Sequence, residues 1–272
     1  MRKVMLVTGA SAGIGREAAI LLAREGHAVY AGARRLDRMQ ELVAHGIFPI
    51  EMDVTEEDDN ERAVSRILEN EGRIDVLINN AGFGLYGPVE EIPLEDARYQ
   101  FEVNLFGLAH LTRLVLPHMR AQRSGRIVNV SSVVGKIFVP LGAWYVATKH
   151  ALEGWSDCLR LETAPFNIPV VLVEPGAIRT EFFDVTRGRL KEYYDDTAYK
   201  TQFEPFLRMF EDPKARDRST EAHVLGEVLV EAATIPRPRR RYVKGHMARP
   251  ALFIRKWLGD GVYEFLLRRA FR

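Results

Sequence analysis

The strongest constraint on the fold of this chain is a glycine-rich turn near its N-terminus, between an apolar segment and a helical one. Residues 3–8, Lys-Val-Met-Leu-Val-Thr, predict a strand, and residues 16–25 predict a helix. Between them lies Gly9-Ala-Ser-Ala-Gly13-Ile-Gly15, spaced Gly-x3-Gly-x-Gly rather than the commoner Gly-x-Gly-x-x-Gly. Glycines also make ordinary tight turns. Between a strand and a helix, however, this turn predicts a phosphate site, because glycine admits close backbone approach and the helix N-terminus offers free N–H groups.

The end of the second predicted strand indicates which dinucleotide would bind. Residues 28–32 form that strand, and Ala33-Arg34-Arg35 follows it. In NAD-binding folds an acidic residue here holds the ribose 2′-hydroxyl, whereas an arginine suits a 2′-phosphate. The strand ends without an acid, so the two arginines predict NADP. The alternative is a charged start to the next helix, since Asp37 and Arg38 are close by.

Strands and helices continue to alternate along the chain. Predicted strands over 48–52 and 74–78 lead into Asp53-Val-Thr55 and Asn79-Asn-Ala-Gly82. We expect Thr55 to cap the helix that follows it. The alternation predicts an α/β fold with a doubly wound parallel sheet of the Rossmann type, and a length of 272 residues suits a single domain.

A tyrosine and a lysine four residues apart indicate acid–base chemistry. Tyr145 and Lys149 share one face of a predicted helix, and Ser132 ends the apolar stretch 126–132 before them. A nearby ammonium favours phenolate over phenol, so we expect Lys149 to lower the pKa of Tyr145 and make it a usable general acid and base. Alone, this spacing is more often that of a solvated helix face, and the rest of the chain raises its weight.

Taken together, these motifs resemble the short-chain dehydrogenase/reductase family over about residues 3–180. The resemblance implies a catalytic set of Ser132, Tyr145, Lys149 and Asn104, with Asn104 holding a water in a proton relay behind Lys149. The resemblance also implies a homo-oligomer, a dimer or a tetramer, in which the predicted helix over 95–122 pairs with its copy. The cofactor expected from the two arginines is NADP, and we expect no metal, because no metal-ligand spacing of Cys or His appears.

The same resemblance implies which residues hold the cofactor. Asp53 and Val54 would contact the adenine, Asn80 the adenosine ribose side, and Thr180 the nicotinamide amide. The full set implied in this way is Gly9, Ser11, Gly13, Ile14, Gly15, Arg34, Arg35, Asp53, Val54, Asn80, Ala81, Gly82, Tyr145, Lys149, Pro175, Gly176, Ile178 and Thr180.

The segment 181–220 is rich in aromatic residues, which predicts a helical lid over an apolar substrate. The chain has 26 aromatic residues in 272, so these 40 positions would hold about four on average. The alternative is ordinary packing onto the core. The segment holds Phe182, Phe183, Tyr193, Tyr194, Tyr199, Phe203, Phe206 and Phe210.

The C-terminal segment 237–272 is both basic and apolar. It carries 11 Lys and Arg against 2 Asp and Glu, a net charge of +9, which leaves the rest of the chain at +1 − 9 = −8. Basic residues beside Trp, Phe and Leu are typical of a helix at a membrane surface. The competing interpretations are an acidic partner surface or the acidic body of this chain. A tail of this kind resembles the hydroxysteroid and retinol dehydrogenase-like branch of the family.

Composition excludes several other classes. A net charge of +1 and the lack of a recognition motif argue against nucleic-acid binding. The single cysteine, Cys158, cannot form an internal disulfide, and no signal segment or long apolar run is visible, so we expect a cytoplasmic protein with a peripheral membrane contact as an option. The sequence thus predicts an NADP-dependent oxidoreductase acting on a bulky lipophilic carbonyl or alcohol. The alternatives are a non-catalytic NADP-binding sensor and a membrane-associated scaffold.

Overall fold

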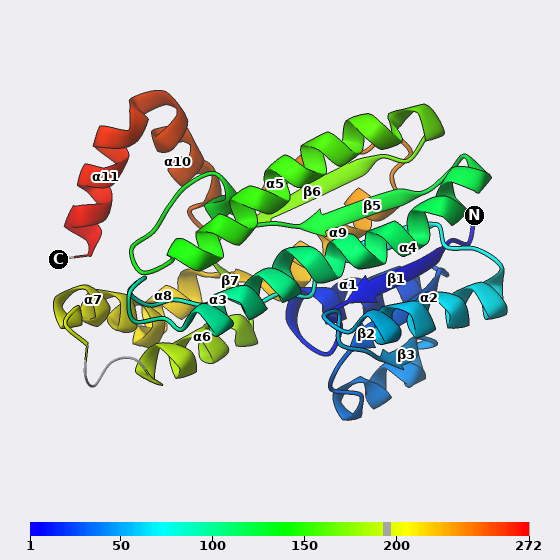
Figure 1. The fold of residues 1–272 in the computed structure, drawn as a ribbon, viewed down its shortest axis with the longest axis horizontal. Helices are drawn as coiled ribbons and strands as arrows, with labels where there is room; N and C mark the ends of the chain where they lie inside the picture. The colour runs from blue at the N-terminus through cyan, green and yellow to red at the C-terminus, as the bar shows by residue number, and fades with distance from the viewer. Residues whose placement is uncertain (193–196, 272) are drawn as a thin grey trace.

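The computed structural model describes residues 1–192 and 197–271, and in them seven parallel strands form one sheet (Figure 1). Its order, β3-β2-β1-β4-β5-β6-β9, confirms the predicted doubly wound arrangement. The chain first builds β2 and β3 on one side of β1, and then returns to build β4 onward on the other side. The strands are β1 Val4–Thr8, β2 Ala28–Ala33, β3 Phe48–Glu51, β4 Val76–Asn79, β5 Arg126–Val130, β6 Val170–Pro175 and β9 Arg241–Lys244.

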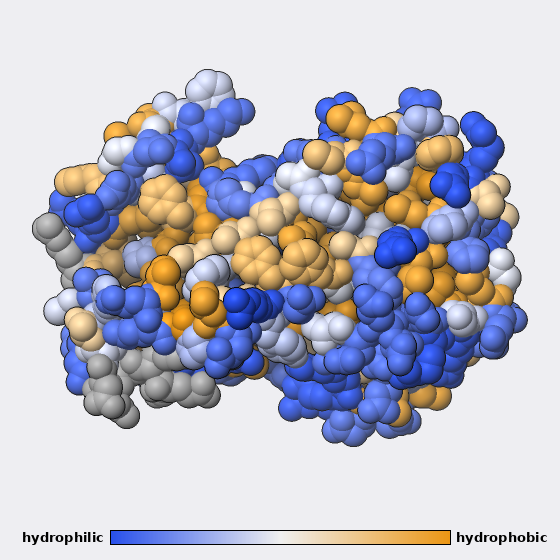
Figure 2. Space-filling view, viewed as in Figure 1, coloured by the Kyte–Doolittle hydropathy of each residue, from blue (hydrophilic) through white to orange (hydrophobic). Residues whose placement is uncertain are grey.

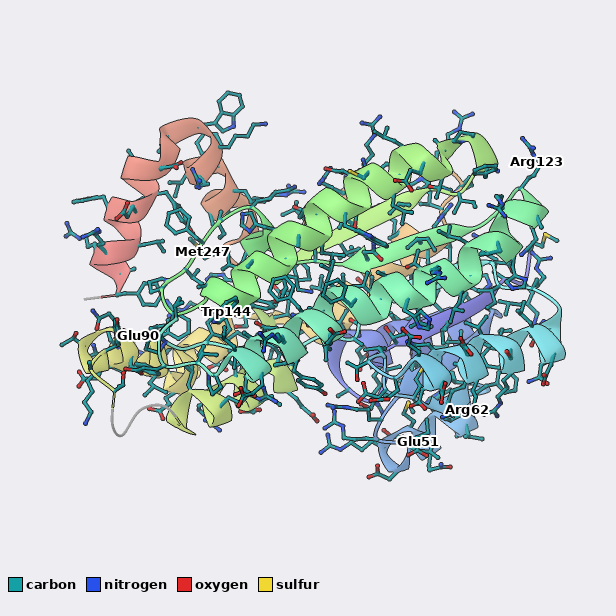
Figure 3. All side chains as sticks on the ribbon, viewed as in Figure 1. Glu51, Arg62, Glu90, Arg123, Trp144 and Met247 are labelled. Carbon is teal, nitrogen blue, oxygen red and sulfur yellow. The ribbon has the colours of Figure 1, made fainter. Side chains whose placement is uncertain are left out.

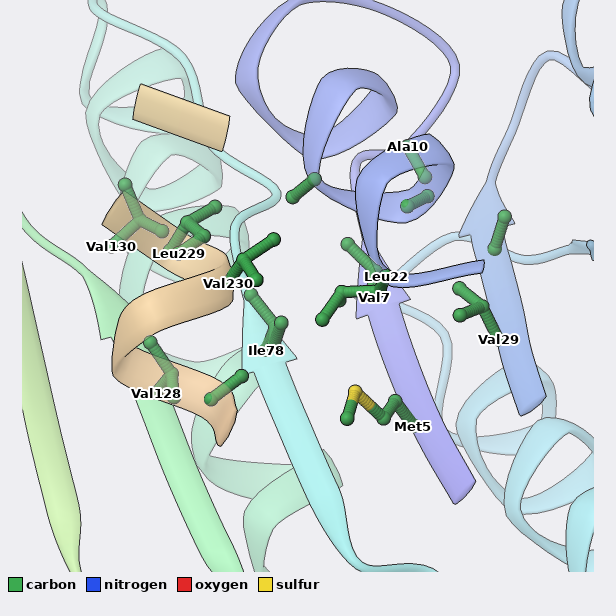
Figure 4. Close-up of a cluster of buried hydrophobic side chains, with 14 of the residues drawn as sticks. Met5, Val7, Ala10, Leu22, Val29, Ile78, Val128, Val130, Leu229 and Val230 are labelled. Atoms are coloured by element: carbon green, nitrogen blue, oxygen red, sulfur yellow. The ribbon is translucent and has the colours of Figure 1, made fainter. Parts of the chain in front are cut away.

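Helices cover both faces of the sheet, so most strand residues are apolar and buried. In β1, Met5 and Val7 point toward α1 and α9 (Figure 4), while Val4 and Leu6 point toward α2, α4 and α5. The alternation follows from the two-residue period of a strand. The covering elements are α1 Gly13–Arg24, the 3₁₀ segment η1 Asp37–His45, α2 Glu57–Glu71, α4 Gly107–Gln122, α5 Ala143–Thr163 and α9 Ala222–Thr234.

The long helix predicted over 95–122 is continuous but not uniform. It consists of α3 Leu94–Phe101, a π-helical turn η2 Glu102–Phe106, and α4. The extra residue of a π turn often marks a functional site, and this one contains Asn104.

The prediction that Thr55 caps the helix α2 is wrong. Thr55 bonds to the Asp53 carboxylate, and α2 begins after Glu56 without a side-chain cap.

Two helical segments stand beyond the carboxyl ends of the strands, at the left of Figure 1. The first lies between the short strands β7 Ile178–Arg179 and β8 Thr220–Glu221, which pair in parallel. It contains α6 Glu181–Glu192, α7 Lys200–Glu211 and α8 Pro213–Arg218. The second, which we call the C-terminal hairpin, contains α10 Ala248–Phe253, the π-helical turn η5 Ile254–Leu258 and α11 Gly259–Ala270.

Some predicted features lie outside the described residues. They are Tyr193, Tyr194 and Arg272, together with the side chain of Phe210. Among the described residues, no helix combines the length and the apolarity needed to cross a membrane.

Candidate active site

The glycine-rich turn forms an open helix end at the carboxyl edge of the sheet. Gly9 and Gly13 adopt φ angles of +66° and +58°, where other residues are strained. α1 then begins after Ala12 without a side-chain cap, which leaves the N–H groups of its first turn available to an anion. The donor chemistry therefore fits a dinucleotide pyrophosphate. A cavity of about 590 Å³ lies at this helix end.

A network of hydrogen bonds ties this turn to the end of β4. The Thr8 hydroxyl accepts from the backbone N–H groups of Asn80 and Ala81, at 3.0 and 3.1 Å. The Asn80 side-chain amide donates to the carbonyl oxygens of Thr8 and Gly9, at 3.0 and 3.3 Å. Gly15 faces the same amide so closely that an added Cβ would lie 2.4 Å from Asn80 Nδ2. Asn80, predicted to contact the ribose side, thus positions the glycine turn in this structure.

The arginines after β2 are all engaged by other side chains. Arg34 donates to the Tyr99 hydroxyl at 2.9 Å and lies 3.6 Å from the Asp53 carboxylate. Arg35 donates to the Ser11 hydroxyl at 3.2 Å, so these two predicted cofactor residues meet in space. Arg35 also reaches Glu181 at 3.4 Å.

Two further charged residues lie at this position, Arg38 and Glu181, and neither is among the predicted site residues. Arg38 donates to both carboxylate oxygens of Glu181, at 2.9 and 2.8 Å. Arg38 is the second residue of η1, whereas Arg34 precedes that segment in a bend, so helical spacing does not link the two arginines. Glu181 lies 143 residues away from Arg38, and no local signal places it there.

Other predicted cofactor residues are divided between the cleft and the core. Thr180 lies against Gly13, and its hydroxyl accepts from the Phe182 N–H at the start of α6. The side chains of Val54 and Ile178 are buried in core clusters on opposite faces of the sheet, so only their backbones are available to a ligand. Gly176 packs against the carbonyl of His246, where a Cβ would lie 2.4 Å from that oxygen.

Ser132 and Tyr145 meet at the carboxyl end of β5. Ser132 caps the short 3₁₀ segment η3 Val133–Gly135 by accepting from the Val134 N–H at 3.3 Å. Burial raises the pKa of Tyr145 to about 12, and a hydrogen bond with Ser132 opposes that rise only in part. The prediction of a lowered pKa is therefore wrong for the protein by itself, because the surrounding side chains remove the phenol from water.

Lys149 lies one turn after Tyr145 on α5 and is buried as well. Its Nζ donates to the Val130 carbonyl at 2.9 Å and lies 5.9 Å from the centre of the Tyr145 ring. Burial lowers the pKa of Lys149 to about 8, although Glu153 on the next turn of α5 raises it somewhat. Lys149 is thus largely charged at neutral pH, and burying this charge lowers the stability of the folded state.

The Asn104 side chain is fully buried and tied to its surroundings. Its amide donates to the Phe83 carbonyl at 2.9 Å and to the Thr148 hydroxyl at 3.1 Å, and its oxygen accepts from the Phe83 N–H. Thr148 in turn donates to the Tyr145 carbonyl at 2.8 Å. Asn104 therefore connects the Gly82 loop to the helix that carries Tyr145 and Lys149. The predicted water relay stays a prediction.

A series of aromatic rings extends from Tyr145 to the C-terminus. Tyr86 lies 5.5 Å from Tyr145, Phe206 of α7 lies 5.2 Å from Tyr86, and Phe271 lies 5.4 Å from Phe206, all between ring centres. Phe182 of α6 lies 5.7 Å from Tyr145 on another side. We call Tyr86, Phe182, Phe206 and Phe271 the aromatic roof.

The surface above the aromatic roof is also apolar. Figure 2 shows apolar side chains between the C-terminal hairpin and the helices of the 181–220 segment. Figure 3 places Trp144, at the start of α5, and Met247, at the foot of α10, at this same end of the molecule. Phe203 and Phe206 are both buried, in the same apolar cluster as Tyr145, and Phe182 packs against that cluster. The rings therefore pack inward, as the alternative of ordinary core packing also predicts, and the helical lid stays a prediction.

Known proteins share both the sequence and the fold. The family model "short chain dehydrogenase" matches residues 3–190. The chain is 34% identical over 272 residues to the 3-ketodihydrosphingosine reductase of Bacteroides thetaiotaomicron, covering 98% of this chain and 97% of that protein. A short-chain dehydrogenase from Streptomyces avermitilis superposes with a TM-score of 0.79 at 33% identity, over 92% of this chain and 90% of that one. The closed form of a serine dehydrogenase with NADP⁺ superposes at 0.77 and 27% identity, over 89% and 94%.

The lowered pKa of Lys149 predicts a trade between stability and function. Below pH 8 the folded state holds a desolvated ammonium, and this cost fades as pH rises from about 8 toward 10.5, the ordinary lysine value. We expect Lys149→Met to raise the free energy of unfolding at pH 7 by about 1–3 kcal/mol. The gain should shrink at pH 10. Denaturant unfolding at both pH values measures it, with the exposed Lys214→Met as control. A loss of stability at pH 7 would show that the bond to Val130 outweighs desolvation.

Proposed function

The chain belongs to the short-chain dehydrogenase/reductase family, and on that premise we propose that it is an NADP-dependent oxidoreductase that interconverts a ketone and an alcohol on a bulky, lipophilic substrate. The observation that carries the substrate class is the aromatic roof, which reaches from Tyr145 to the C-terminal hairpin. The observation that carries the chemistry is the buried group of Ser132, Tyr145 and Lys149.

In the reduction direction, the hydroxyls of Ser132 and Tyr145 would both donate to the substrate carbonyl oxygen. The cofactor, when bound, supplies hydride to the carbonyl carbon or accepts it from the alcohol carbon. Tyr145 would give its proton to the oxygen as that oxygen gains charge, and the Lys149 ammonium would stabilise the phenolate left behind. Because burial keeps Tyr145 protonated, the site by itself is prepared for reduction.

Three arginines support NADP as the cofactor. Arg34 and Arg35 follow β2, which ends in Ala33 rather than in an acid, and Arg38 joins them from η1. Guanidinium groups match the geometry of phosphate oxygens, and Ser11 offers a further hydroxyl beside Arg35. The superposed serine dehydrogenase binds NADP⁺, which is consistent with this proposal.

The aromatic roof supports a long or bulky apolar substrate. Each ring belongs to a different part of the chain, and together they would cover an alkyl group attached to the reacting carbonyl. A relative named as a 3-ketodihydrosphingosine reductase is aligned over nearly the whole chain, which favours a long-chain ketone over the steroid and retinoid alternatives. The hydroxysteroid and retinol dehydrogenase-like branch stays a prediction.

The outer face of the C-terminal hairpin supports a peripheral contact with an anionic lipid surface. Its inner face packs on the site, where the Tyr263 hydroxyl donates to the Phe138 carbonyl at 2.9 Å. On the outer face Phe253, Trp257 and Phe265 are 58%, 67% and 61% exposed. The hairpin carries Arg249, Arg255, Lys256, Arg268 and Arg269 against Asp260 and Glu264. The C-terminal hairpin thus has apolar side chains on both faces and basic residues beside them, which suits the boundary between water and lipid. The lipophilic substrate proposed for the protein would also be found there.

Replacing Tyr145 tests the catalytic proposal. Tyr145→Phe removes the proton donor without changing the ring, so kcat should fall by at least about 100-fold in NADPH-dependent reduction of a lipophilic ketone. Tyr242→Phe removes the hydroxyl of a buried β9 residue that packs on the α1 and α9 face of the sheet and accepts from the Arg239 N–H, and it should leave the rate unchanged. Near-normal turnover of Tyr145→Phe would contradict the assignment. Tight NADPH binding by a wild-type protein that turns over no ketone of a broad panel would favour the sensor.

Chain length tests the substrate class. Across 3-keto lipids of increasing length, kcat/KM should climb about fourfold per added methylene until the substrate extends past the aromatic roof, because each buried methylene contributes about 0.8 kcal/mol. Phe271→Ala should flatten the climb for the longest members only, since Phe271 is the outermost ring of the series. A flat wild-type profile, or a preference for small polar carbonyls, would contradict the lipophilic proposal.

Vesicle binding tests the membrane contact. Wild-type protein should sediment with vesicles of anionic phospholipid, and the triple variant Phe253→Ser, Trp257→Ser and Phe265→Ser should bind at least about tenfold more weakly. The matched control, Val43→Ser, Val89→Ser and Leu161→Ser, removes three exposed apolar side chains from other parts of the surface and should bind vesicles as the wild type does. If the triple variant instead dissociates a wild-type dimer or tetramer and vesicles do not bind, the face belongs to a second copy of the chain.

A further inference from the structure

We infer that Glu181 is an internal counter-ion for the arginines proposed to hold the 2′-phosphate, and that it sets how strongly the chain prefers NADP. The inference rests on the proposed NADP specificity and extends it to a residue outside the phosphate-binding turn. Its basis is the pairing of one carboxylate with two guanidinium groups that approach from a different part of the chain.

The Glu181 carboxylate occupies the position beside Arg35 and Arg38 to which these arginines would attract a phosphate. Glu181 accepts from Arg38 through both oxygens and from Arg35 through one. Arg35 also donates to Ser11, in the turn that opens α1. The carboxylate and the two guanidinium groups are each about half exposed, at 45–49% of their side-chain surface. All three can therefore rearrange when a charged ligand arrives.

Glu181 brings to this region a carboxylate that the end of β2 lacks, but it pairs with Arg35 and Arg38. β2 ends in Ala33. The nearby Asp53 carboxylate lies 3.6 Å from Arg34, so its described ion pair is with that arginine. A carboxylate from the first turn of α6 thus occupies the donors of these two arginines in the absence of phosphate. NADP would have to exchange the carboxylate for its 2′-phosphate, whereas NAD would leave the pairs intact. The wild-type residue therefore weakens NADP binding and leaves NAD binding nearly unchanged.

The exchange would also connect the cofactor to the substrate side of the cleft. Glu181 is the first residue of α6, and the next residue, Phe182, belongs to the aromatic roof beside Tyr145. Breaking the pairs with Arg35 and Arg38 would release the start of α6 from η1. The residue that precedes Glu181 is Thr180, which lies against Gly13.

The test compares Glu181→Gln with a matched control, Asp184→Asn, which removes a carboxylate of similar exposure from the same helix. Asp184 pairs with Arg187 and has no described contact with Arg35 or Arg38. Binding is measured by calorimetry with adenosine 2′,5′-bisphosphate and adenosine 5′-monophosphate, which differ only in the 2′-phosphate and carry no nicotinamide. Glu181→Gln should bind the bisphosphate about three- to tenfold more tightly and the monophosphate as the wild type does.

Three results would overturn the inference. Weaker binding of the bisphosphate by Glu181→Gln would mean that the carboxylate holds the arginines in position for the phosphate. Unchanged binding would mean that it does not compete. If Asp184→Asn gained the same affinity for the bisphosphate, the effect would come from losing any negative charge in this region and not from the pairing of Glu181 with the arginines. Failure of the NADP proposal is seen separately, as a wild-type protein that binds the monophosphate as tightly as the bisphosphate.

Discussion

Both edges of β1 are hydrogen-bonded to parallel neighbours, β2 on one side and β4 on the other, and the rest of the structure depends on this pairing. Since the crossovers leave β1 in opposite directions, a crevice opens beside its carboxyl end, where a ligand can enter. Four hydrogen bonds of the Thr8 hydroxyl and the Asn80 amide connect the end of β1 to the residues that follow β4. This network fixes the glycine turn against the end of β4 without filling the space that a dinucleotide needs.

The residues that we propose as catalytic are held by burial and by hydrogen bonds from unrelated segments. Lys149 donates to the end of β5, and Asn104 joins the π turn η2 to the Phe83 backbone and to α5. A π turn widens the helix by one residue, which lets Asn104 face the site while its neighbours continue the helix. The consequence is a rigid site whose charged lysine is expensive to bury, a common balance between stability and function.

In our proposal, the substrate is selected by parts of the chain that lie outside the common fold. Tyr86 comes from the loop after β4, Phe206 from α7, and Phe271 from the end of the C-terminal hairpin. The hairpin therefore has two roles in our proposal. One face completes the apolar cover of the site, and the other presents aromatic side chains to a lipid surface, so a lipophilic molecule would meet apolar surface along its whole path.

The sequence by itself determined the order of strands and helices, the glycine turn, and the shared face of Tyr145 and Lys149, because each depends on residues close together in the chain. Tertiary structure decided what depends on distant neighbours. The pKa of Tyr145 is raised, not lowered, since Tyr86, Phe182 and other segments bury it.

Tertiary structure also divided the charges that the sequence groups together. The basic run 237–240 precedes β9 and the hairpin follows it, so the two halves of the basic segment lie at opposite ends of a strand. Arg241 belongs to neither half, because it pairs with Glu153, Asp157 and Glu174 of α5 and β6. Glu181 meets Arg35 and Arg38 across more than a hundred residues for the same reason: a parallel sheet brings the carboxyl ends of all its strands to one edge, whatever their distance along the chain.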